Sequence, residues 1–145
     1  MMSNTIEAQN AAEIHRKSEQ RSDLWSDVRV YEGRERAAED RAEELRSVAR
    51  NIDAQTGPLR QVFLPIRGLH TATTWEGNAA TQSRTRLDIH ESRTSGAITT
   101  LDALVDDLYA EATRADADAS SARASAGSAR WSIGRLTDQI NGLAA

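Results

Sequence analysis

The chain of 145 residues contains no cysteine, only two prolines and few aromatic residues, which make up 4% of the sequence. The lack of cysteine excludes disulfides and thiolate metal sites but leaves the cellular compartment open. The scarcity of proline leaves long stretches uninterrupted, and the scarcity of bulky aromatic residues argues against a globular core. Long helices packed side by side therefore fit this composition better than a layered α/β domain.

Charged residues are abundant, at 28%, but neither sign dominates, and the formal net charge is −4. Because both signs are interspersed, nothing indicates nucleic acid or an anionic membrane as a partner. The longest apolar stretch, VFLPI at residues 62–66, is far too short to span a bilayer. The first residues lack the charged-then-apolar arrangement of a signal peptide. If the protein is exported, we therefore expect export without a conventional leader.

The first part of the chain is expected to form one helical arm over about residues 4–73. Apolar side chains recur on it at alternating steps of four and three, the spacing of a helix that packs along its length. Gly57 and Pro58 are typical of a helix stop and restart, and Pro65 should start or kink a second short piece. The arm is therefore expected to break near residues 56–65. The expected seam positions are Leu24, Val28, Tyr31, Glu35, Ala38, Ala42, Leu45, Ala49 and Ile52.

The second arm is expected to cover about residues 78–143. Its seam positions keep the same spacing except for one extra four-residue step after Leu108, which would form a stutter that locally unwinds a supercoil. His90 falls on this seam and is interpreted as a partly buried packing residue. The expected positions are Leu87, His90, Thr94, Ala97, Leu101, Leu104, Leu108, Ala112, Ala115, Ala119, Ala122, Ala126, Ala129, Ile133, Leu136, Ile140 and Leu143.

These arms predict an all-α fold in which residues 1–145 form a single domain. It is a long antiparallel helical hairpin with a kinked first arm and a turn at residues 74–78. A lone hairpin of this length cannot fully bury both seams, so pairing into a four-helix bundle or coiled coil is expected. The partner-facing seam is assigned to Leu24, Val28, Tyr31, Leu45, Ile52, Leu101, Leu104, Leu108, Ile133, Leu136 and Ile140.

The expected turn has the sequence TTWEGNAA, in which Trp75 and Gly77 are followed by Ala79 and Ala80. Leucines precede it in LRQVFLPIRGL and follow it in AITTLDALVDDLYAEA. Over about residues 58–118 the chain thereby resembles the WXG superfamily, the small helical-hairpin substrates of type VII secretion. The resemblance implies that Trp75 and Gly77 are the functional pair. Glycine would permit the chain reversal, and tryptophan would expose a small apolar corner that the secretion machinery reads in a dimer.

The chain also departs from this family in length and in its export signal. Family members are usually shorter, and their signal, Tyr-x-x-x-Asp/Glu, follows the second helix. Here Tyr109 is followed at the fourth position by Thr113. Tyr31 and Glu35 match the spacing but lie on the first arm, where a seam tyrosine with an exposed glutamate one turn later is the simpler interpretation. The resemblance therefore implies either an exported hairpin or the partner that accompanies an exported protein.

No residue pattern indicates catalysis. His15, His70 and His90 are scattered, with no second ligand at metal spacing, and phosphate loops and nucleophile motifs are absent. Trp25 and Trp131 are interpreted as packing anchors.

The sequence thus predicts a non-enzymatic protein without metal, cofactor or small-molecule substrate, secreted without a conventional signal peptide. It would form a homo-oligomer or a hetero-dimer with another helical hairpin. The alternative is a cytoplasmic structural or scaffolding coiled-coil protein with a chance Trp-x-Gly turn.

Overall fold

The structure of the protein, a computed structural model, describes residues 2–70 and 77–145. In these ranges the chain forms three α-helices and no strand. They are α1 (Met2–Leu59), α2 (Leu64–His70) and α3 (Asn78–Ala144). Segments of α1 and α3 pack antiparallel, so the all-α helical hairpin expected from the sequence is confirmed.

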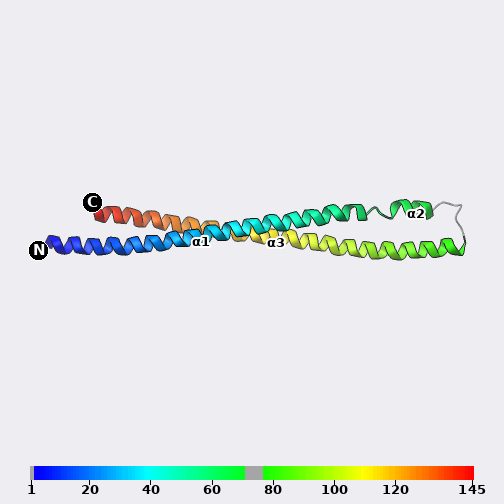
Figure 1. Cartoon of the computed structure of the whole chain (residues 1–145), viewed down its shortest axis with the longest axis horizontal. Coiled ribbons are helices and arrows are strands. Elements are labelled where there is room, and N and C mark those ends of the chain that lie inside the picture. The colour runs from blue at the N-terminus through cyan, green and yellow to red at the C-terminus, as the bar shows by residue number, and fades with distance from the viewer. Residues whose placement is uncertain (1, 71–76) are drawn as a thin grey trace. The chain divides into compact units, whose positions relative to one another are not determined.

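The hairpin divides into two compact units, each described here by itself. Unit 1 combines the chain up to Arg41 with Arg114–Ala145, and both chain ends lie at the same end of this unit (Figure 1). Unit 2 is Ala42–Thr113 and contains the end of α1, the whole of α2 and the first half of α3. Within unit 2, the cyan-to-green end of α1 runs beside the yellow-to-green part of α3 (Figure 1).

The buried side of α1 follows the predicted spacing of three and four residues. Val28, Ala42 and Ala49 are at most 1% exposed, and the other predicted positions are partly buried. Thr56 extends this seam by one step and is itself 1% exposed. Its hydroxyl group donates a hydrogen bond of 2.7 Å to the carbonyl oxygen of Ile52, so the buried polar group has a partner.

The predicted register of α3 is wrong at three positions in the first half of the helix. Their side chains are exposed, and they are His90, Ala97 and Leu104. His90 is therefore not the partly buried packing residue that the sequence suggested. The residue after each of them is the buried or partly buried one: Glu91, Ile98 and Val105. With these positions the spacing alternates between three and four along the whole helix, and the expected stutter does not occur.

In unit 1 the buried side of α3 consists mainly of alanine. Small side chains let two helix backbones approach closely, but each buries little apolar area. Larger contacts are made where Val28 packs with Ile133, next to Leu24. The alanines in this part of the seam are at most 8% exposed and comprise Ala115, Ala119, Ala122, Ala126 and Ala129.

The first arm breaks at residues 60–63, inside the predicted interval. α1 continues through Pro58 and ends at Leu59, so the helix stops slightly later than the expected restart at Pro58. The turn that follows is held by short-range backbone bonds, such as the one of 3.2 Å from the Gln61 amide to the Pro58 carbonyl oxygen. Pro65 lies in the first turn of α2, where its missing N–H needs no intrahelical partner. The predicted restart at Pro65 is thus confirmed.

Two neighbouring residues test the observed register. Val105 is 8% exposed and Leu104 is 43% exposed. We expect Val105→Ala to lower the free energy of unfolding by about 1 to 2 kcal/mol, because it removes buried methyl groups and leaves a cavity. Leu104→Ala removes more carbon but should cost less than about 0.5 kcal/mol, because the side chain is exposed. Urea unfolding followed by circular dichroism measures both values, and a larger loss for Leu104→Ala would contradict the register.

Candidate functional site

The predicted functional pair lies just before α3. Trp75 falls outside the described residues, whereas Gly77 is described and has a φ of 106°. The carbonyl oxygen of Gly77 accepts hydrogen bonds from the backbone amide of Thr81 at 3.0 Å and from its hydroxyl group at 3.1 Å. Because a side chain at this φ would be strained, the third position of the Trp-x-Gly sequence needs glycine for a structural reason.

The two alanines after this glycine have different environments. Ala79 is exposed, whereas Ala80 is completely buried and begins the buried seam of α3. A larger residue at Ala80 would have to displace its neighbours. The backbone of Gly77 and the small side chain of Ala80 therefore both constrain how α3 begins.

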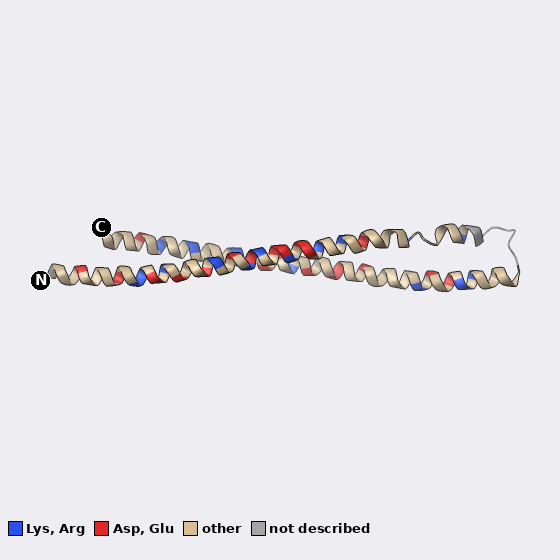
Figure 2. Ribbon diagram, viewed as in Figure 1, with Lys and Arg blue, Asp and Glu red and all other residues tan. Residues whose placement is uncertain are grey.

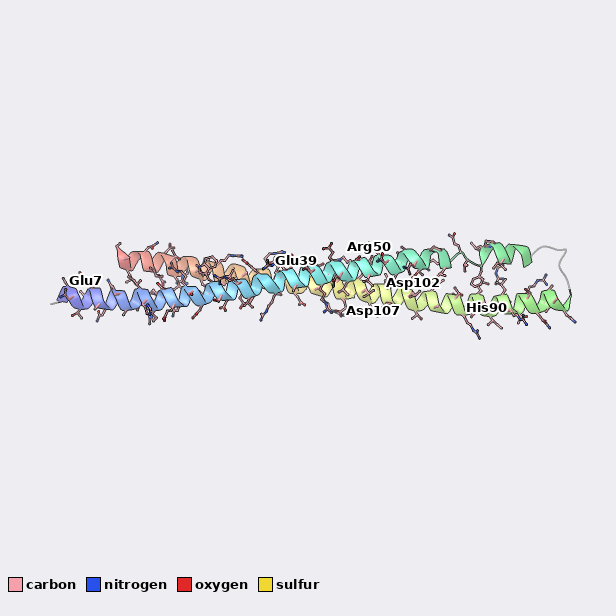
Figure 3. All side chains as sticks on the ribbon, in the orientation of Figure 1. Glu7, Glu39, Arg50, His90, Asp102 and Asp107 are labelled. Atoms are coloured by element: carbon pink, nitrogen blue, oxygen red, sulfur yellow. The ribbon has the colours of Figure 1, made fainter. Side chains whose placement is uncertain are left out.

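Ion pairs hold the far end of the first arm against α3 in unit 2. The guanidinium of Arg67 on α2 donates to Asp88 at 3.0 Å and also to Glu91. An isolated helix of seven residues is not stable in water, so α2 depends on such contacts. In the turn before α2, Arg60 pairs with Asp102, and the hydrogen bond and charge of this carboxylate raise the pKa of Arg60. Figure 3 shows Asp102 on the side of α3 toward α1.

Large apolar side chains are exposed close to the same end of unit 2. We call residues 59–66 the apolar segment. Four of its side chains are between 41 and 64% exposed: Leu59, Val62, Leu64 and Ile66. Scattered single apolar residues are normal on a protein surface, but four within eight residues mark a candidate binding surface. The run VFLPI at residues 62–66 is the sequence signal for this surface, but its length was considered only as a possible membrane span and not as a binding site.

A surface hollow of about 290 Å³ lies next to the apolar segment. Four of its eight lining residues are apolar, so part of the hollow would suit an apolar side chain of a binding partner. The hydroxyl groups of Thr94 and Ser95 line the hollow, but neither a histidine nor a pair of carboxylates accompanies them among the lining residues, so the arrangement suits binding better than catalysis. The residues that line it are Leu59, Arg60, Phe63, Leu64, Glu91, Thr94, Ser95 and Ile98.

Ten of the eleven residues assigned to the partner-facing seam are buried or partly buried on their helices. These ten side chains hold the hairpin itself, and whether any also faces a partner stays a prediction. Leu104 is the exception, because it is exposed. The ten are Leu24, Val28, Tyr31, Leu45, Ile52, Leu101, Leu108, Ile133, Leu136 and Ile140.

The residues of the candidate export signal have partners within unit 1. Glu35 accepts a hydrogen bond of 2.8 Å from Nε of Arg123, whose Nη2 also donates to Glu39 at 3.0 Å. The carboxylates of Glu35 and then Glu39 raise the pKa of Arg123 by hydrogen bonding and charge. The guanidinium of Arg34 lies 5.8 Å from the centre of the Tyr31 ring. The role of Tyr31 and Glu35 in export stays a prediction.

Polar residues on both helices of unit 1 also pair near the chain ends. Lys17 donates to Gln139 at 2.8 Å, and Arg21 donates to the hydroxyl of Thr137 at 3.3 Å. Lys17 and Arg21 lie at the two positions near the start of the α1 seam where the side chain is polar instead of apolar. Figure 2 shows charges of both signs distributed along α1, as expected for a helix with a solvated face.

The two tryptophans that the structure describes are exposed, so the interpretation of both as packing anchors is wrong. Trp25 is 45% exposed and Trp131 is 65% exposed. The guanidinium of Arg135 lies 5.0 Å from the centre of the Trp131 ring, which is a cation–π distance. Both rings therefore remain available for contacts that unit 1 alone does not provide.

Within residues 2–70 and 77–145, no group of three or more acidic or histidine side chains could hold a metal ion. In the same ranges, no helix carries an apolar stretch long enough for a membrane crossing. Comparison of the chain with family models, characterised proteins and solved structures finds no significant match.

Matched glycine substitutions test the conformation of Gly77. We expect Gly77→Ala to lower the free energy of unfolding by about 1 to 2 kcal/mol, because alanine is strained at this positive φ. The control is Gly33→Ala in the interior of α1, where an added Cβ meets nothing within 4 Å. That control should raise stability by about 0.5 to 1 kcal/mol through helix propensity. Thermal unfolding of both variants gives the comparison, and equal effects would refute the assigned role of Gly77.

Proposed function

We propose that this chain is a non-enzymatic helical protein of type VII-like secretion that works by binding another protein. It is either an exported hairpin or the partner that accompanies an exported protein. It needs no cofactor, and it is secreted from the cell. Its binding partner is a second helical hairpin, of the same or of another sequence.

The backbone at Gly77 supports this proposal. A glycine with positive φ lies directly before α3, so the last position of the Trp-x-Gly sequence has a structural role at the start of this helix. The position of the motif therefore fits the family pattern in which Trp75 and Gly77 act as a pair.

The exposed apolar segment is the observation on which the proposal mainly depends. Leu64, at 64% exposed, and its neighbours present apolar surface in unit 2, close in sequence to Trp75. Binding another protein would remove this area from water at about 25 cal/mol per Å². Since the adjoining hollow offers no catalytic arrangement, recognition is the function that these side chains suit.

A cytoplasmic scaffolding coiled coil is the second candidate function. The uninterrupted spacing of buried positions on α3, which continues well beyond the family-like region, favours it. A scaffold would use the length of the helices and would not depend on the identity of Trp75. The two candidates therefore differ in what the removal of the Trp75 ring does.

Secretion from the native host distinguishes these functions. A tagged native chain and the variant Trp75→Ala are expressed, and the protein is quantified in the culture medium and in the cell pellet. If the chain is exported or escorted, we expect the native protein in the medium. We expect the variant to remain in the cell with unchanged helicity, because it lacks the ring that the machinery would recognise.

Trp25→Ala is the matched control. It removes an exposed tryptophan ring in unit 1, distant in sequence from the turn, and should be secreted like the native chain. If native chain and both variants all stay in the pellet, the secretion proposal fails and the scaffolding function is favoured. If Trp75→Ala is secreted as well as the native chain, the assigned role of Trp75 is wrong.

A further inference from the structure

Within unit 2, α2 is attached to α3 by a charged side chain, while its apolar side chains face solvent. Each residue of α2 whose burial is described is exposed, including Leu64 and Ile66. Arg67, in contrast, reaches α3, where its guanidinium donates hydrogen bonds to Asp88 at 3.0 Å and to Glu91. A surface helix usually buries an apolar side and leaves its charges in water. The docking of α2 is therefore inverted.

Few apolar contacts add to this attachment. Between residues 57 and 68, Phe63 is the only residue that is not exposed, and it is only partly buried. Seven residues are too few for an independently stable helix in water. The turn at residues 60–63, which joins α2 to the end of α1, is held by long backbone hydrogen bonds of 3.2 to 3.5 Å. Among the described residues, ion pairs are thus the main contacts that hold α2 on α3.

These ion pairs are open to solvent on both sides of the turn. Arg67 pairs with Asp88 and Glu91 after the turn, and Arg60 pairs with Asp102 at its start. All five side chains are between 38 and 66% exposed. Exposed ion pairs contribute little to stability and weaken further when salt screens the charges. The attachment of α2 therefore depends on contacts that ionic strength controls.

We propose that α2 is an ion-held latch, which exchanges between a closed form docked on α3 through Arg67 and an open form released from it. Rising ionic strength favours the open form, because screening weakens the ion pairs and little apolar area of α2 is buried to oppose release. In the open form the seven-residue helix melts, because it has lost the contacts that stabilise it.

The latch also controls the hollow of about 290 Å³ beside the apolar segment, because the walls of the hollow belong to both sides of the contact. Phe63 and Leu64 come from the first arm, and Thr94 and Ile98 come from α3. Release of α2 would remove the wall formed by Phe63 and Leu64. A partner side chain that fills the hollow would then favour the closed form, and closing would favour that partner equally. This consequence rests on the proposed function, whereas the latch itself does not.

Hydrogen exchange of the Arg67 amide measures the latch in the isolated chain. This N–H donates to the carbonyl oxygen of Phe63 at 2.9 Å, a bond that is lost when α2 melts. We expect its exchange, followed by NMR, to become about threefold to tenfold faster between about 50 and 500 mM sodium chloride. Amides in the interior of α3, such as that of Ala122, should exchange far more slowly and change less than about twofold.

Neutralising the carboxylates on α3 tests the ion pairs without altering α2. In the double variant Asp88→Asn with Glu91→Gln, the guanidinium of Arg67 loses both charged partners. At low salt, the Arg67 amide of this variant should already exchange as fast as that of the native chain at high salt. Added salt should then change its exchange less than about twofold. Circular dichroism should show that α1 and α3 remain helical.

The matched control removes the same two charges from another arginine. Glu35→Gln with Glu39→Gln deprives Arg123 of its carboxylate partners in unit 1. This control should leave the exchange of the Arg67 amide, and its dependence on salt, at the native values. A difference between the two double variants therefore reports the contact of α2 with α3 and not the net charge of the chain.

Three results would overturn the inference. The Arg67 amide could exchange as slowly as the interior of α3 at both salt concentrations, which would mean that α2 does not open. Its exchange could be unchanged in the variant without Asp88 and Glu91, which would mean that ion pairs do not hold α2. The control could accelerate exchange equally, which would indicate a general effect of charge. None of these measurements involves export, so failure of the latch and failure of the proposed function are separate results.

Discussion

The alternation of three and four residues between buried positions is the constraint on which both units of the hairpin depend. It places a continuous seam on α1 and on α3, and neither helix buries much apolar area elsewhere. Where the α3 seam consists of alanine, as at Ala119 and Ala126, the two helices can approach closely but bury little apolar area. Ion pairs at the edges of the seam, such as Arg123 with Glu35, then help to fix which residues face each other.

Two prolines determine how the first arm ends. Pro58 permits the last turn of α1 but cannot donate a backbone hydrogen bond, and the following residues form a turn before Pro65 restarts a helix. A seam that has been interrupted in this way no longer buries every apolar side chain. Val62, Leu64 and Ile66 consequently reach solvent, which gives this part of unit 2 the apolar surface that a binding function requires.

Most of the helix boundaries and the seam of α1 could be predicted from the sequence, because periodicity, two prolines and one glycine determine them. The register of α3 could be predicted only in part. At Ala97–Ile98 and Leu104–Val105 two apolar residues are adjacent, so a pattern of apolar letters does not decide which of them faces inward. The pairs of Arg67 with Asp88 and Arg60 with Asp102 could not be foreseen, since they depend on which residues become neighbours across the two helices.

The difficulty with the α3 register has a physical origin. In α1 the charged residues between the seam positions leave one apolar line, so its seam is read with little ambiguity. In the first half of α3 the residue directly before a buried position can be apolar as well, as at Ala97 and Leu104. Two neighbouring lines of positions therefore look like a seam, and only the packing of this part of α3 against α1 decides which of them is buried.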